Sequence, residues 1–167
     1  GGGRRGGGGR EDDGQGRWFL SLYHSIELAN EALIAPGIPV IDYFDLGLAR
    51  HSVDLEGGVF YKGLGTRLSG RYRSGYTIAG STPANDLTFG DLTTFDLRFF
   101  MNLEEQKWLT GESPGFFKGA RVSLGVDNIF NTRQDVFDGN GITPIRFQPA
   151  LVDPLGRTFE IEFRKLF

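Results

Sequence analysis

The sequence predicts an all-β protein, namely a segment of an antiparallel up-and-down transmembrane β-barrel, and two observations lead to that prediction. The 167 residues include 26 glycines together with 15 Phe, 5 Tyr and 2 Trp. So many glycines would weaken helices, whereas they suit sheets with tight turns. From Arg17 onward, apolar and polar side chains alternate with a period of two, which is typical of strands with one buried face.

Six alternating segments predict six strands. In each segment one face is apolar and the other is charged: Leu97 and Phe99 point one way, for example, while Asp96 and Arg98 point the other. The predicted strands cover residues 17–28, 51–61, 64–79, 91–103, 117–130 and 157–167. Consecutive antiparallel strands place their connections alternately at the two ends of the sheet.

Residues 1–16 precede the first strand and contain no apolar side chain, which predicts a flexible connector rich in glycine and arginine. Arginine–glycine tracts also occur in RNA-binding tails. Here the arginines of the tract are balanced by acidic residues, and the whole chain has a net charge of −3. We therefore expect no nucleic-acid partner, since binding to phosphates requires a basic surface.

The sequence offers no pattern typical of an enzyme. It contains no G-x-S-x-G, no H-E-x-x-H and no phosphate-binding glycine loop, and without cysteine it has no disulfide or thiolate ligand. His24 and His51 are isolated in the sequence, so we expect no metal site there. Residues 135–141 have the wrong ligand spacing for a calcium loop and predict a turn stabilised by Asp and Gly. We expect no catalytic residues and no cofactor.

Two architectures share the alternating pattern. In a soluble β-barrel or sandwich that binds an apolar ligand, the apolar face points inward; in an outer-membrane barrel it contacts lipid and the charged face lines the lumen. The alternation extends over 11 to 16 residues per segment, as long as or longer than the roughly 9 to 11 residues that a membrane strand needs. This favours the membrane barrel. Six strands do not close such a barrel, so we expect further strands, from a longer protein or from several copies of this chain.

A two-residue turn at Lys62–Gly63 would fix the register of the strands on either side of it. It pairs residues whose numbers sum to 125, which places Asp54 opposite Arg71 as a charge pair on the lumen face. Gly63 can supply a positive φ, whereas Lys62 is a poorer turn residue than Asn, which leaves the turn type open.

Several segments, in the correct order and spacing, resemble the TonB-dependent outer-membrane receptors. Residues 126–131 (VDNIFN) are similar to a V-x-N-L-F-D element at the end of a late barrel strand in that family. The C-terminal end resembles the family in residues 147–149, 153–157 and 164–167, and residues 21–24 and 67–70 are similar to a proteobacterial branch of it.

The resemblance implies a bacterial outer-membrane barrel of about 22 strands, of which this chain would form the last six, filled by an N-terminal plug domain. Such receptors take up scarce nutrients, often ferric siderophores, with energy passed on by TonB. The implied partners are outer-membrane lipid, the remaining strands and plug, TonB through an N-terminal part absent from this sequence, and the barrel-assembly machinery. That machinery would read a C-terminal signal formed by Phe159, Ile161, Phe163 and Phe167.

The resemblance also orients the strands. With the C-terminus in the periplasm, residues 29–50, 80–90 and 131–156 become extracellular loops, whereas residues 62–63, 104–116 and 1–16 become periplasmic. The sequence assigns no residue to substrate binding, because none of these loops carries a cluster distinctive for one ligand class.

Overall fold

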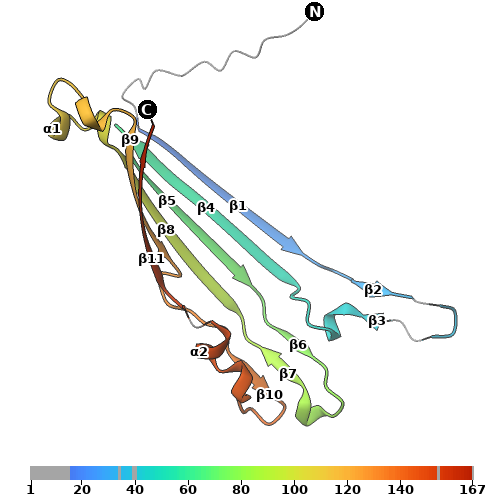
Figure 1. The fold of residues 1–167 in the computed structure, drawn as a ribbon. Coiled ribbons are helices and arrows are strands. Elements are labelled where there is room, and N and C mark those ends of the chain that lie inside the picture. The colour runs from blue at the N-terminus through green and yellow to red at the C-terminus, as the bar shows by residue number, and fades with distance from the viewer. Residues whose placement is uncertain (1–15, 34, 39–40, 154, 167) are drawn as a thin grey trace, which may run out of the picture.

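A computed structural model describes residues 16–33, 35–38, 41–153 and 155–166 of the chain. Residues 1–15 of the predicted connector and Phe167 of the predicted C-terminal signal lie outside the described residues. The main feature is a six-stranded antiparallel sheet (Figure 1). Its strands are β1 (Arg17–Ile26), β4 (His51–Tyr61), β5 (Leu64–Arg73), β8 (Leu92–Asn102), β9 (Ala120–Asp127) and β11 (Thr158–Lys165).

The order of the strands in the sheet is β1-β4-β5-β8-β9-β11, which is their order along the chain. The predicted all-β class and antiparallel up-and-down arrangement are therefore confirmed. Within the described part of the chain the sheet is open, because β1 and β11 each pair on one side only. No helix among the described residues is long and apolar enough to cross a membrane.

The register separates the two faces of the sheet over its whole width. Each cross-strand partner lies on the same face as its neighbour, so the alternation within strands adds up to two continuous surfaces. The apolar face carries Trp18, Leu20, Leu22, Val53, Leu55, Val59, Leu68, Phe95, Leu97, Phe99, Val122, Leu124, Val126, Phe159, Ile161 and Phe163. The charged face carries Asp54, Glu56, Arg67, Arg71, Arg73, Asp96, Arg98, Arg121, Asp127, Glu160, Glu162 and Arg164.

The β4–β5 turn sets this register. Lys62 has φ 46° and Gly63 has φ 73°, and two successive positive φ values define a type I′ turn, whose twist matches that of the flanking strands. Asp54 consequently lies opposite Arg71 and Val53 opposite Tyr72, as the sequence predicts. The structure thus settles the turn type that the sequence left open.

The single strand expected over residues 64–79 is wrong. β5 ends at Arg73, and β6 (Tyr76–Ile78) leaves the main sheet to pair with β7 (Leu87–Phe89). The cause is Asp91, whose carboxylate accepts a hydrogen bond of 2.6 Å from the backbone N–H of Gly75 and another of 3.1 Å from the hydroxyl of Tyr72. A side-chain acceptor that takes a backbone donor competes with the strand ladder and ends it there.

β4 covers the predicted residues 51–61, whereas the other five strands are shorter than predicted, at 8 to 11 residues. Besides β5, the largest difference is at β9, for which residues 117–130 were expected. A 3-10 turn (Gly115–Phe117) precedes it. At its other end Asn128, with φ 51°, both donates to and accepts from the backbone of Thr132. The Asn128 side chain thus takes up backbone groups of Thr132 that would otherwise pair with a neighbouring strand, and β9 ends before this point.

The connections alternate between the two ends of the sheet, as expected. One end holds the Lys62–Gly63 turn and α1 (Lys107–Thr110) with the 3-10 turn before it (Leu103–Glu105); the other holds the three long connections (Figure 1). We call these the turn end and the loop end. The loop end contains β2 (Glu31–Ala32), β3 (Ile41–Asp42), β6, β7, β10 (Val136–Asp138), α2 (Pro149–Val152), and 3-10 turns at Tyr43–Asp45, Pro83–Asn85 and Ile145–Phe147.

Candidate functional site

Ion pairs cross the charged face between neighbouring strands. Arg71 Nε lies 3.9 Å from Asp54 Oδ1, so the structure brings the two predicted partners together, and Arg67 Nε lies 3.4 Å from Glu56 Oε1. Each of these four side chains is about half exposed to solvent or more. Exposed pairs contribute only about 0.2–1 kcal/mol each, so this face is built for a wet environment more than for stability.

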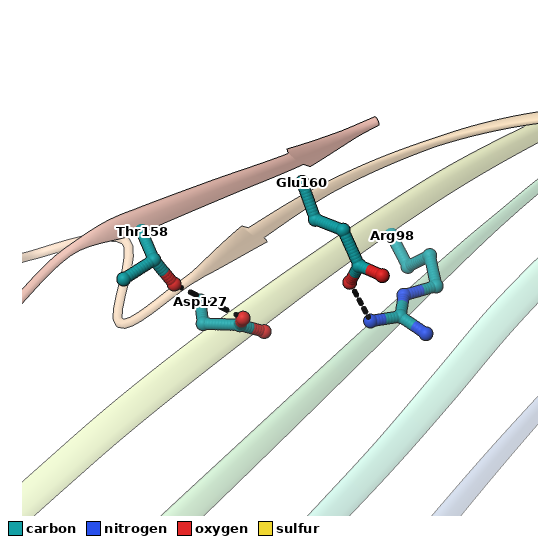
Figure 2. Close-up of polar contacts among 4 residues, drawn as sticks. All are labelled: Arg98, Asp127, Thr158 and Glu160. Atoms are coloured by element: carbon teal, nitrogen blue, oxygen red, sulfur yellow. Dashed lines mark hydrogen bonds and ion pairs between the residues drawn. The ribbon is translucent and has the colours of Figure 1, made fainter. Parts of the chain in front are cut away.

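A third ion pair spans an intervening strand. Arg98 on β8 and Glu160 on β11 meet at 2.9 Å (Figure 2). Gly125 of β9 is the cross-strand partner of both and lies between them. Nε and Nη2 of Arg98 each lie 3.6 Å from the point where a Cβ of Gly125 would be, and the Cβ of Glu160 lies 3.4 Å from it. Glycine therefore leaves open the path along which the two side chains meet. Beside this pair, the Thr158 hydroxyl donates to Asp127 at 3.2 Å (Figure 2).

On this face two pairs of arginines are direct cross-strand partners, and the two pairs differ in how their positive charges are compensated. Arg67 and Arg98 are cross-strand partners, but each forms an ion pair with a carboxylate on another strand, Arg67 with Glu56 of β4 and Arg98 with Glu160 of β11. Arg121 and Arg164 are also partners, and among the described residues neither forms an ion pair. The Arg121 guanidinium instead stacks 3.8 Å from the centre of the Phe100 ring, a cation–π contact that leaves its charge uncompensated by a carboxylate.

The charged face is hollowed at its centre. A groove of about 410 Å³ extends over β4, β5, β8 and the end of β9. Most of its lining side chains are charged: Asp54, Glu56, Arg67, Arg71, Asp96, Arg98 and Asp127. Its mixed acidic and basic lining is suited to polar groups rather than to an apolar ligand.

Aromatic rings cover the charged face near the turn end. Phe60 lies between Phe19 and Phe100, with ring centroids 6.0 and 5.4 Å apart. These rings fill space left by glycines on the neighbouring strands, because a Cβ at Gly58 would overlap Phe19 and one at Gly65 would overlap Phe100. Glycine within a strand normally weakens it. Here each glycine leaves room for an aromatic ring on the neighbouring strand, which explains why glycine occurs at these positions.

The apolar face is uncovered by any described segment. Phe159 and Ile161 of the predicted C-terminal signal are 74% and 79% exposed, and Phe163 is 54% exposed. All three lie on the apolar face of the edge strand β11. Monomeric soluble proteins rarely expose a contiguous apolar surface of this extent, so this face requires an apolar environment or partner.

The three long connections at the loop end pack into one unit. Val136 of β10 pairs with Phe89 of β7, both are buried, and Phe89 stacks on Tyr76 with ring centroids 4.6 Å apart. A bridge between Leu46 and Ile78 joins the first connection to the second. The sequence did not predict this small core, because its members are single apolar residues in polar segments.

The turn expected in residues 135–141 is present. The Asp138 carboxylate accepts hydrogen bonds of 2.9 Å from the backbone N–H groups of Ile142 and Asn140. The bond from Ile142, and then that from Asn140, holds the pKa of Asp138 below its ordinary value of 3.8. Among the described residues no three His, Asp or Glu side chains gather in a way that could hold a metal ion.

Sequence reasoning missed two long-range side-chain contacts. One is the Arg98–Glu160 pair, for which the spacing of 62 residues gives no signal. The other joins His24 and His51, whose rings lie 5.7 Å apart on the apolar face.

Comparison with family models, with curated proteins and with solved structures finds no match for this chain.

Proposed function

We propose that this chain forms the C-terminal part of the barrel of a TonB-dependent outer-membrane receptor, which takes up a nutrient such as a ferric siderophore. The observation that carries the proposal is the separation of the two faces over all six strands, with the apolar face uncovered. A transmembrane β-barrel has this construction, with lipid outside and a polar lumen inside. The sequence segments that resemble the family support the same assignment.

The open edges of the sheet support a larger barrel. Within lipid, every backbone N–H and C=O needs a partner, and an open sheet edge leaves a row of them without one. The outer edges of β1 and β11 have no partner among the described residues. In the proposed receptor they pair with the remaining strands, and a plug domain with TonB contacts occupies the charged side.

The two ends of the sheet fit the proposed orientation. The loop end, with its three interlocked connections, would face the outside of the cell and the turn end the periplasm, since such barrels have longer outer loops. In this arrangement Asp54 and Arg71 belong to the lumen. Phe159, Ile161 and Phe163, together with Phe167, form the C-terminal signal for the barrel-assembly machinery.

Single cysteines on adjacent residues distinguish this proposal from the alternative, a soluble β-barrel or sandwich that binds an apolar ligand. Leu97→Cys and Arg98→Cys lie on opposite faces of β8; Leu124→Cys and Ser123→Cys form a matched pair on β9 that leaves the ion pairs intact. In outer-membrane preparations of the complete gene product, a lipid-phase thiol reagent is expected to label Leu97→Cys and Leu124→Cys. The other two variants should react only with a water-soluble reagent.

The reverse labelling, with residues 97 and 124 protected from lipid, would support the soluble alternative. A second measurement concerns the complete gene product. It should migrate differently in gels before and after heating, as folded outer-membrane barrels do, and the coding sequence upstream of Gly1 should encode a plug domain. A soluble, heat-insensitive product without such an upstream sequence would overturn the receptor assignment.

A further inference from the structure

His24 and His51 lie next to each other on the apolar face although 26 residues separate them in the sequence. His24 on β1 is opposite Val53, and His51 on β4 is opposite Ile26, so the two histidines are diagonal neighbours across the β1–β4 pair. Their ring centroids are 5.7 Å apart and their planes differ by 24°. Both side chains are exposed to solvent, so both rings are free to turn about their side-chain torsions.

The ring separation suits one metal ion shared by two imidazoles. Metal–nitrogen bonds of about 2.0–2.1 Å place each ring centroid about 3.2 Å from the ion, so that two ligating rings lie at most about 6.4 Å apart. The observed 5.7 Å falls within this limit. We propose that His24 and His51 form a two-histidine site for a divalent transition-metal ion of the zinc, nickel or copper class, a binding site separate from the uptake function proposed above.

The backbone around His51 is fixed, which favours such a site. His51 is the first residue of β4; its backbone N–H donates to the Ser74 hydroxyl at 3.1 Å, and its carbonyl accepts from the Ser74 N–H at 2.9 Å. His24 lies within the ladder of β1. Only the imidazole rings therefore need to adjust when an ion binds, which keeps the entropy cost of binding small.

The surroundings select the class of ion. The cross-strand neighbours of the pair on this face are Ile26, Val53 and Tyr72, and the Tyr72 hydroxyl already donates a hydrogen bond to Asp91. Beyond the strands, His51 lines a hollow together with Phe44 and Arg50. Oxygen-seeking ions such as Mg²⁺ and Ca²⁺ find no carboxylate among these neighbours, whereas imidazole is a preferred ligand of zinc, nickel and copper.

A bound ion would also connect two strands. Because His24 belongs to the edge strand and His51 to its inner neighbour, an ion held by both stabilises the β1–β4 pairing, as any ligand that binds only the folded state does. The pair is at the loop end of both strands, where water and ions can reach it if the rest of the apolar face is covered by lipid.

Zinc and nickel titrations of the purified complete gene product, folded in detergent micelles, test the proposal. Isothermal titration calorimetry should show one zinc ion per chain, and Mg²⁺ should show none. His24→Gln and His51→Gln should each weaken zinc binding at least 10-fold, since one imidazole alone cannot chelate. Val59→Gln, a polar substitution on the same face of β4 away from the pair, is the control and should bind zinc as the unchanged chain does.

Metal-induced changes in the NMR spectrum provide a second measurement. Sub-stoichiometric Cu²⁺ should broaden the imidazole signals of both histidines together, while circular dichroism establishes that each variant retains its sheet. The proposal is overturned if the unchanged chain binds no zinc, if both glutamine variants bind it with undiminished affinity, or if copper broadens the signals of only one ring. Because these readouts do not involve uptake or membrane insertion, they are independent of the proposed receptor function.

Discussion

Arg98 and Glu160 form an ion pair of 2.9 Å although a complete strand lies between the strands that carry them. The contact passes over Gly125, which is the cross-strand partner of both residues and has no side chain between them. Charges on β8 and β11 are thus joined across β9, although these two strands are not paired with each other. The pair holds the edge strand β11 to β8 in addition to the ladder between β11 and β9.

A double-mutant cycle measures this pair. Arg98→Gln, Glu160→Gln and the double variant should give a coupling free energy of about 0.2–1 kcal/mol, because roughly half of each side chain is exposed. Reversible urea unfolding in detergent gives the three differences, and the coupling should fall at high salt. Gly125→Leu, which fills the path between the two residues, should remove most of the coupling. A coupling unchanged by Gly125→Leu would contradict the role given to this glycine.

Gly65→Val should destabilise the sheet by forcing Phe100 out of its position. A Cβ at residue 65 would overlap the Phe100 ring, and overpacking of this kind costs about 1–3 kcal/mol. The free energy of unfolding is the measurement. In the background of Phe100→Ala, where the ring is absent, the same substitution should cost much less. Equal costs in the two backgrounds would show that the ring is not the obstacle.

Arg164→Glu should stabilise the β9–β11 pairing. Arg164 lies directly opposite Arg121, and replacing a like-charge pair by an opposite-charge pair is worth about 0.2–1 kcal/mol. Arg164→Gln, which removes the repulsion without adding attraction, is expected to give a smaller gain. If Arg164→Glu instead lowers the free energy of unfolding, an acidic group from a segment outside the described residues already compensates Arg164.

Acid should loosen the turn at Asp138 in a defined pH window. Since the pKa of Asp138 is lowered in the folded chain, the folded state binds fewer protons than the unfolded state, and its contribution is fully present above the ordinary value. This contribution is lost as the pH falls below 3.8 through the lowered pKa. Hydrogen exchange of the Asn140 and Ile142 amides should accelerate, relative to neighbouring loop amides, over this window.

Asp138→Asn is the control for the acid effect, because it keeps an acceptor oxygen but has no charge to lose. Its turn amides should show no such transition between about pH 5 and about pH 2, a range that brackets the ordinary pKa of an aspartate. Acid-dependent exchange that persists in the variant would assign the effect to another carboxylate of the loop end.

The sequence by itself determined the local order of the sheet. Alternation with a period of two assigns each side chain to a face, and the turn at Lys62–Gly63 places Asp54 opposite Arg71, because a slip of one residue would move every apolar side chain to the charged face. Both are properties of short, contiguous segments. The position and order of the six strands follow from them.

Only the tertiary structure decided which distant side chains meet across the sheet and where a strand is interrupted. The break after Arg73 depends on the Asp91 carboxylate, which is close to Gly75 only in the folded chain. The Arg98–Glu160 contact passes over Gly125, which has no side chain between them, and the adjacency of His24 and His51 depends on the register between β1 and β4. That register carries no signature in the sequence, because the connection between the two strands is long and fixes no pairing.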